Sequence, residues 1–256
     1  MMIIPAVSSR RRRVALLLML YLASKASAFS PLSFAAATRP LIQMSALPTA
    51  AQVSTDDFMK QLGHASRIIP VLHPEDGSSP SQAELAALLK LLTKQFAHSD
   101  GIRGFFAVYL TSSEFMKMDE VPSVLAEAVK GSNMKVMVPL ACMNVIMPTA
   151  MSSIHEDAEL KECATKTALN GLKILRLLKE NSEVFDNCQA IYSVSNNEVE
   201  GGNDLMEYWN KFFVNYNYGP GQKAEISRVI KEFCGVVERR TDRVSYCEEE
   251  KKLEIE

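Results

Sequence analysis

Apolar residues recur every three or four positions along most of the chain, which is the period of an amphipathic α-helix. The clearest case is residues 79–98, where a Ser81-x-x-Glu84 capping box precedes an apolar stripe. The stripe consists of Leu85, Leu88, Leu89, Leu92 and Phe96. This segment predicts a helix that buries one face.

The same period predicts further helices between well-marked breaks. Gly219-Pro220-Gly221 forbids helix continuation and predicts an antiparallel turn. The run at residues 105–111 lacks strand-like alternation, so we assign it to helix. The other expected helices cover residues 121–130, 158–179, 181–192, 204–216 and 222–240. We therefore predict an all-α fold: a compact orthogonal bundle of about seven helices over residues 55–240, followed by a charged tail at 241–256.

The beginning of the chain has a different pattern. Arginines at positions 10–13 precede an apolar run at 14–23, and residues 26–28 read Ala-Ser-Ala. This is the organisation of a cleaved signal peptide over residues 1–28, because the apolar run is about half of the ~20 residues that a membrane span needs. Residues 29–54 are rich in Ala, Ser and Thr and contain no acid, which is typical of a transit peptide.

The junction of these two segments carries a motif. Residues 26–31 read Ala-Ser-Ala-Phe-Ser-Pro. This resembles the Ala-Ser-Ala-Phe-X-Pro motif of precursors imported into the complex plastids of diatoms and related red-lineage algae. In that class the signal peptide directs entry through the endoplasmic reticulum, and the aromatic residue exposed by cleavage is required to cross the inner envelopes. The resemblance implies that Ala26, Ala28, Phe29 and Pro31 are targeting residues read by the import machinery.

Two further observations refine this address. No second signal-like apolar run with an Ala-x-Ala site follows in residues 40–60, so we expect the plastid stroma and not the thylakoid. A reducing stroma also fits five cysteines without a Cys-x-x-Cys pair, which predicts free thiols.

The presequence holds six of the 28 basic residues and no acid, which leaves 22 basic and 30 acidic residues and a net charge of −8. This acidity excludes non-specific binding to nucleic acid.

One segment is unusually rich in methionine. Met143, Met147 and Met151 are spaced by four and share a stripe if the segment is helical. Such a soft surface suits a protein partner or a hydrophobic cofactor. The alternative is a buried core helix with Pro139 in its first turn and a kink or break at Pro148. A membrane span has less support, because sixteen apolar-biased residues holding two prolines fall short of the required length.

The best candidate for metal binding or acid–base chemistry follows directly. His155, Glu159 and Cys163 are successive i+4 neighbours, so one helix face can present imidazole, carboxylate and thiolate. The alternative is a helix start with acids in its first turn, which requires no function. Cys163 and Cys234 are candidate redox-sensitive thiols, with buried inert thiols as the alternative.

Other candidate sites are weaker. Arg103 lies between Gly101 and Gly104, where backbone amides can approach an anion, although a tight turn explains the glycines equally. Tyr208 and Tyr216 can form an exposed docking face on an aromatic-rich helix. The histidines His64, His73 and His98 lie near expected helix ends, where capping or solvated roles are common.

The chain lacks the common catalytic motifs: a Walker A loop, a G-x-G-x-x-G fingerprint, a G-x-S-x-G elbow and the kinase set. The sequence names no cofactor. We therefore expect a stromal accessory or assembly factor that binds a protein partner or a hydrophobic cofactor. The alternative is an enzyme without common motifs, with a site around His155 together with Glu159, Arg103 or Cys163.

Overall fold

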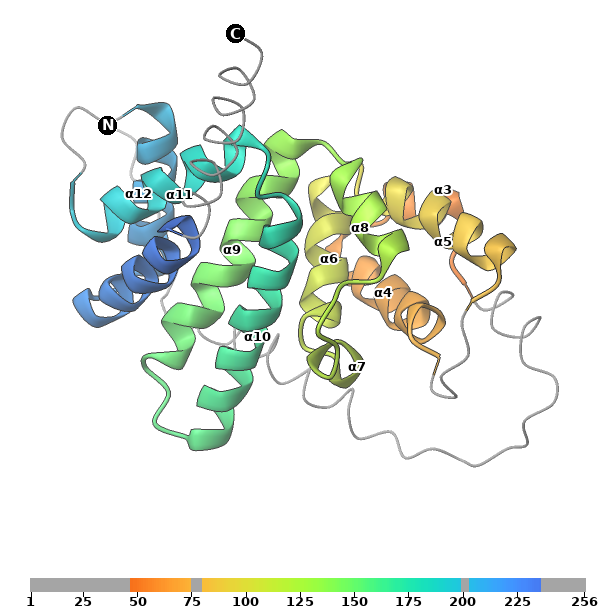
Figure 1. Cartoon of the computed structure of the whole chain (residues 1–256), viewed down its shortest axis with the longest axis horizontal. Helices are drawn as coiled ribbons and strands as arrows, with labels where there is room; N and C mark the ends of the chain where they lie inside the picture. Colours follow the sequence, from red (N-terminus) through yellow and green to blue (C-terminus); the bar gives the residue numbers. More distant parts are fainter. Residues whose placement is uncertain (1–46, 75–79, 199–202, 236–256) are drawn as a thin grey trace, which may run out of the picture. The chain divides into compact units, whose positions relative to one another are not determined.

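The computed structural model describes residues 47–74, 80–198 and 203–235, and all regular elements in these ranges are helices (Figure 1). The all-α prediction is therefore confirmed. The described helices outnumber the seven that we expected, because four of them were not among those seven: α3 (Ala50–Thr55), α4 (Phe58–Leu72), the single-turn α7 (Ser113–Met116) and α9 (Met134–Ser152), whose methionine-rich segment was considered separately.

Several sequence predictions lie outside the described residues. These are the signal peptide at 1–28, the targeting motif at 26–31 and the charged tail at 241–256. The predicted transit peptide at 29–54 is described only from residue 47 onward. Helix α3 begins at Ala50, so the last residues of that segment belong to the folded part of the chain.

Contacts divide the chain into two compact units, residues 1–124 and 125–256. The single domain that we predicted over residues 55–240 thus contains two units. Each has its own hydrophobic core, and each is described separately below.

The N-terminal unit is built on a pair of packed helices, α4 and α6, with α5 against α3 and α6. Its core is mainly aromatic, and the rings of Tyr109 and Phe115 have centroids 4.4 Å apart. Phe96, Phe105 and Phe106 complete this cluster. The helices are α3 (Ala50–Thr55), α4 (Phe58–Leu72), α5 (Gln82–Gln95), α6 (Ser99–Tyr109) and α7 (Ser113–Met116). The predicted capping box of Ser81 and Glu84 is confirmed at the start of α5.

Two glycines of α6 let the helices of this unit approach closely. A Cβ on Gly101 would lie 1.8 Å from the Gln95 carbonyl oxygen, and a Cβ on Gly104 would lie 2.4 Å from the Gln61 Cβ. Such distances leave no room for a side chain. For Gly101–Gly104 we also considered a tight turn. That prediction is wrong, because both glycines lie within α6.

The C-terminal unit contains α9 (Met134–Ser152), α10 (Ala158–Leu177), α11 (Ser182–Ser195) and α12 (Asp204–Tyr216), and residues 220–235 are also helical. Helix α8 (Ser123–Lys130) begins at the boundary between the units. Helix α9 packs mainly on α10 and also contacts α11, which packs on α12. Side chains of Asn133, Asp157, Asn181 and Asn203 cap α9 to α12 by accepting backbone N–H bonds.

Helix α9 runs through both of its prolines, which corrects two expectations. Pro139 is not in the first turn, and the helix does not break at Pro148. Because Pro148 has no N–H, the Asn144 carbonyl loses its intrahelical donor. That carbonyl faces α10 at Gly171, where a Cβ would lie 2.5 Å from its oxygen. Gly171 therefore allows α10 to pack closely on the part of α9 that Pro148 weakens.

Candidate functional site

The methionine stripe of α9 is neither core nor open surface. Met143, Met147 and Met151 lie on one helix, as predicted, and each side chain is half-buried. The fully buried face of the same helix carries other residues, including Val138, Cys142 and Ile146. The stripe therefore offers partly accessible, polarizable side chains, and the prediction of a core helix filled by methionine is wrong for these three residues.

Helix α9 is also the one helix among the described residues that is long and apolar enough to cross a membrane, by length and composition alone. It has 19 residues, more than the sixteen that we counted from the sequence. Within the structure, 44% of its apolar window is buried. Burial against α10 and α11 thus accounts for its apolar character.

The structure does not assemble the predicted site at His155. Helix α10 starts at Ala158 with Asp157 as its N-cap, so His155 lies in the preceding loop and shares no helix face with Glu159 and Cys163. Both Glu159 and Cys163 are exposed. Among the described residues, no group of three His, Cys, Asp or Glu side chains is placed to hold a metal ion. His155 keeps one unusual feature: its Nε2 is buried and has no hydrogen-bond partner in the described part of the chain.

Arg103 is a surface residue of the N-terminal unit. Its guanidinium lies 3.7 Å from the Asp100 carboxylate and over the ring of Phe58, with 5.1 Å from its Cζ to the ring centroid. These contacts explain its position without a ligand. It belongs to a different unit from His155, so no site joining the two is described.

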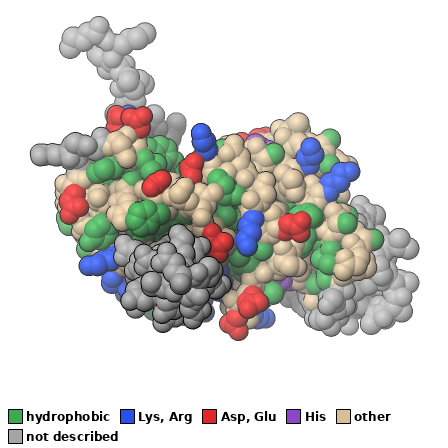
Figure 2. Space-filling view, turned by 45° about the horizontal axis from the view of Figure 1, so that its top comes forward, with side chains coloured by type: hydrophobic (Ala, Val, Ile, Leu, Met, Phe, Trp, Pro, Cys, Tyr) green, Lys and Arg blue, Asp and Glu red, His purple; other side chains and the backbone are tan. Residues whose placement is uncertain are grey.

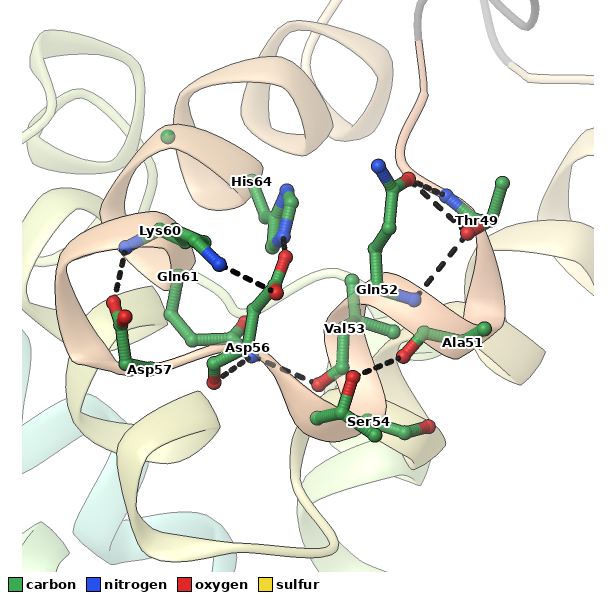
Figure 3. A network of polar contacts seen from close by, with 12 residues as sticks. Thr49, Ala51, Gln52, Val53, Ser54, Asp56, Asp57, Lys60, Gln61 and His64 are labelled. Carbon is green, nitrogen blue, oxygen red and sulfur yellow. Dashed lines mark hydrogen bonds and ion pairs between the residues drawn. The ribbon is translucent and has the colours of Figure 1, made fainter.

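The N-terminal unit contains a network of buried polar side chains (Figure 3). His64 is 3% exposed in the middle of α4, which corrects our expectation of a helix-end residue. Its Nδ1 lies 2.7 Å from Arg67 Nη2 and its Nε2 lies 2.8 Å from Asp56 Oδ2. An arginine N–H can only donate, so Nδ1 accepts and Nε2 carries the proton that bonds Asp56. Both ring nitrogens are engaged, which leaves His64 no free nitrogen for proton transfer.

The same contact changes the acidity of Asp56. The hydrogen bond from His64 holds the pKa of the Asp56 carboxyl below its ordinary value, and Lys60 adds a weaker effect in the same direction. Figure 3 shows His64 and Lys60 both directed at this carboxylate. The arrangement fixes the start of α4 against its middle.

Two glutamines extend this network through the interior. The amide nitrogen of Gln61 donates to the carbonyls of Val53 and Asp56, and that of Gln95 donates to Gln61 Oε1 at 3.0 Å. His98 also bonds the Val53 carbonyl and caps α6, as predicted for this histidine. Both glutamines are fully buried. One buried acceptor of this network, Gln95 Oε1, has no hydrogen-bond partner among the described residues.

His73 ends α4 and lies next to the aromatic core. It is the C-cap of that helix, and its Nε2 lies 3.0 Å from the Tyr109 hydroxyl. The two rings also stack, with centroids 5.6 Å apart. Burial raises the pKa of the Tyr109 hydroxyl well above its ordinary value, so this group stays protonated. The contact is structural, and its position at a helix end agrees with the sequence prediction.

The aromatic helix α12 presents two faces. Trp209 is fully buried and donates its indole N–H to Asn187 Oδ1 of α11 at 3.0 Å. Tyr208, Phe212 and Tyr216 lie beside it at positions i, i+4 and i+8; Tyr208 is 42% and Tyr216 46% exposed, whereas Phe212 between them is only 8% exposed. Desolvation raises the pKa of the Tyr208 hydroxyl, and the nearby Tyr216 adds to this. We call these three residues the α12 ridge.

Three thiols meet inside the C-terminal unit. Cys142 on α9, Cys188 on α11 and Cys234 on the last described helix are buried, whereas Cys163 is exposed. Hydrogen-bonding contact with Cys142, together with burial, raises the pKa of the Cys188 thiol, and Cys234 contacts the same sulfur. A raised thiol pKa lowers the fraction of reactive thiolate. The raised pKa supports an inert core thiol at Cys188, and burial alone supports the same reading for Cys234.

Comparison with known proteins adds a family to this description. A family model described as Uncharacterised conserved protein UCP020893 matches residues 76–233, from just before α5 to the last described helix. No curated protein and no solved structure matches the chain. The matched range is more than half of the 256 residues. The chain therefore belongs to the family described as Uncharacterised conserved protein UCP020893.

Proposed function

We propose that this chain is a stromal plastid accessory or assembly factor that acts by binding a protein partner through its C-terminal unit. The observation that carries the proposal is the distribution of exposed large apolar side chains. Among the described residues, Met59 alone belongs to the N-terminal unit. The others lie in the C-terminal unit: Ile154, Leu160, Leu169, Phe185, Tyr208, Val214 and Tyr216.

The α12 ridge is the part of this surface best suited to a partner. Tyrosine combines a large apolar ring with a hydroxyl that remains hydrated, and tyrosines are common among residues that dominate interface energy. Helices α11 and α12 pack on each other, so their side chains are held on a firm support. Figure 2 shows apolar side chains reaching the surface between charged ones. Such a mixed surface is typical of a specific, reversible interface.

The presequence supports the plastid part of the proposal. Its two segments and the Ala-Ser-Ala-Phe-Ser-Pro junction at residues 26–31 resemble those of proteins imported through the endoplasmic reticulum into complex plastids. The acidic remainder of the chain argues against nucleic acid as the partner. We further propose that the helices within each unit pack as a compact orthogonal bundle, which their short connections favour.

A hydrophobic cofactor is the second ligand class that we consider. The half-buried stripe of Met143, Met147 and Met151 favours it, because thioethers adapt to apolar ligands of varied shape. An enzyme with a site around His155 receives less support. The unpartnered Nε2 of His155 favours it, but Glu159 and Cys163 are not brought to this ring.

The test is a native mass and an absorption spectrum of the chain isolated gently from its own plastids. A partner lost from a Tyr208→Ser/Tyr216→Ser variant, but kept by a Met59→Ser control, supports the proposal. A visible absorption band with no added protein mass would select the cofactor instead. A bare, colourless monomer would contradict the binding function.

A further inference from the structure

The C-terminal unit contains a cavity of about 390 Å³ that is separate from the α12 ridge. It opens between the end of α9, the first two thirds of α10 and the helix at residues 220–235. Its volume lies in the range of about 300–1,000 Å³ that small-molecule sites occupy. No residue of the α12 ridge lines it.

One wall of the cavity is polar and carries a positive charge. Lys161 lines it, and in the described part of the chain no carboxylate lies within 4.0 Å of its ammonium. Hydroxyls of Ser152, Ser153 and Thr165 stand on the same wall. Each donates to a carbonyl of its own helix, at 2.8–2.9 Å. A hydroxyl can turn from such a bond to a ligand with little cost, because the backbone oxygen accepts elsewhere in the helix.

The second cation at the cavity is already neutralised. Arg228 bonds Glu225 through two guanidinium nitrogens, at 2.7 and 3.1 Å, and bonds Glu232 at 3.1 Å. The hydrogen bonds from Arg228 hold the pKa of the Glu225 carboxyl below its ordinary value, with a smaller contribution from Lys161. Glu225 therefore stays ionised and bound to Arg228. Lys161 remains as the cation available to a ligand.

Further along α10 from Lys161 and Thr165, the lining of the cavity becomes apolar. Ala168 and Leu172 of α10 are nearly buried, Leu169 is 53% exposed, and Val229 faces them from the last described helix. Leu169 is thus an apolar side chain at an open cavity with no described residue covering it. An apolar group placed here removes its surface from water, at about 25 cal/mol per Å².

Gly221 keeps the cavity open beside these walls. It lines the cavity, and no atom lies within 4 Å of the position where a Cβ would stand. Its backbone is outside the left-handed region, so a larger residue meets no strain. A side chain at this position of the lining would therefore have room without straining the helix.

We propose that this cavity binds a small organic anion with an apolar body, such as a medium-chain carboxylate or the matching phosphate ester. The anionic group pairs with the Lys161 ammonium and accepts hydrogen bonds from the hydroxyl wall. The apolar body lies against Leu169, Leu172 and Val229. The site is independent of the partner surface, so either can fail without the other.

The experiment is titration of the full chain, by calorimetry, with four probes. Decanoate and decyl phosphate are used below their micelle concentrations, decanol below its solubility limit, and inorganic phosphate serves as the head group alone. Saturable 1:1 binding is expected for one or both of the first two, and the tighter one identifies the head group. Decanol is expected to bind about tenfold more weakly than that ligand, because it lacks the charge-assisted bond. Inorganic phosphate is expected to show no saturable binding.

Matched variants locate the site. Lys161→Gln is expected to raise Kd about tenfold, and Gly221→Leu to abolish binding. Lys166→Gln changes a lysine of the same helix that pairs with Glu162, outside the cavity, and Gly63→Leu changes another glycine with open space around it. Both controls should bind as the parent does, and melting curves should show all four folded. The proposal would be overturned if Lys161→Gln or Gly221→Leu bound the ligand as tightly as the parent. It would also be overturned if neither anionic probe showed saturable binding to the parent.

Discussion

The two units of this chain treat their polar and apolar groups differently. The N-terminal unit buries polar side chains and hydrogen-bonds most of their polar atoms: Gln95 donates to Gln61, and His64 bonds Asp56. The C-terminal unit leaves apolar side chains exposed on α10, α11 and α12 and holds the cavity at Lys161. A buried polar network favours a single well-defined structure, whereas exposed apolar side chains mark interaction sites. On this comparison we propose that the N-terminal unit contributes stability and the C-terminal unit contributes binding.

The largest effect is expected from closing the tightest helix contact of the N-terminal unit. In Gly101→Ala, the new Cβ would lie 1.8 Å from the Gln95 carbonyl oxygen. Helices α5 and α6 must move apart to remove this clash. We expect a loss of about 3 kcal/mol or more in the free energy of unfolding. Chemical denaturation measures it. Gly63→Ala is the control, since its Cβ would meet no atom within 4 Å and a gain of about 0.4–1 kcal/mol is expected. Equal effects of the two changes would show that this contact is not tight.

The second effect tests whether the buried glutamine network is satisfied. Gln61→Ala removes the donor to the Asp56 carbonyl and the acceptor for Gln95, leaving these buried groups without partners. We expect a loss of about 2–3 kcal/mol in the free energy of unfolding. Urea denaturation gives the value, and Gln189→Ala on exposed α11 surface is a control expected to stay within about 0.5 kcal/mol. A change below that size at Gln61 would mean that water replaces the lost bonds.

The third effect concerns pH. The pKa of Asp56 in the folded chain lies below its ordinary value of 3.8, so its contact with His64 stabilises the fold above that pH. This contribution is lost as the pH falls through the lowered folded pKa. The difference in stability between the parent and Asp56→Asn should therefore be constant above about pH 5 and shrink in more acidic solution. Denaturation of both chains from pH 7 to pH 2.5 measures it, and a difference that grows towards low pH would contradict the assignment.

The smallest effect on stability is expected on the α12 ridge. Tyr208 and Tyr216 are more than two-fifths exposed, so replacing each by Ser should change the free energy of unfolding by about 0.5 kcal/mol or less. Thermal melting followed by circular dichroism checks this. A loss above about 2 kcal/mol would show that these side chains belong to the core and would remove the basis for a docking surface.

Several elements could be read from the sequence because local signals agreed with the packing. Ser81 and Glu84 mark the start of α5, and α11 begins within a residue of the predicted position 181. Helix α4 was missed although Ala65, Ile68, Ile69 and Leu72 have helical spacing. Gly63 and Pro70 interrupt its propensity, and packing against α6 decides the outcome. Propensity yields to tertiary context at such positions.

The candidate site was harder to predict than the helices. Spacing alone placed His155 with Glu159 and Cys163, but the cap at Asp157 starts the helix after His155. The cavity joins residues of α9, α10 and the last described helix that lie far apart in the sequence, so no local pattern identifies it. Tyr208 and Tyr216 were predicted as an exposed pair because both belong to one helix, where spacing determines the face.

The most direct test of the account is the native mass of the chain isolated from its own plastids, compared among three forms. The parent and Met59→Ser are predicted to carry the same additional protein mass, and Tyr208→Ser/Tyr216→Ser is predicted to have the mass of the bare chain while melting as the parent does. Retention of the partner by the double variant, with loss from Met59→Ser, would place the binding surface on the N-terminal unit and contradict the account.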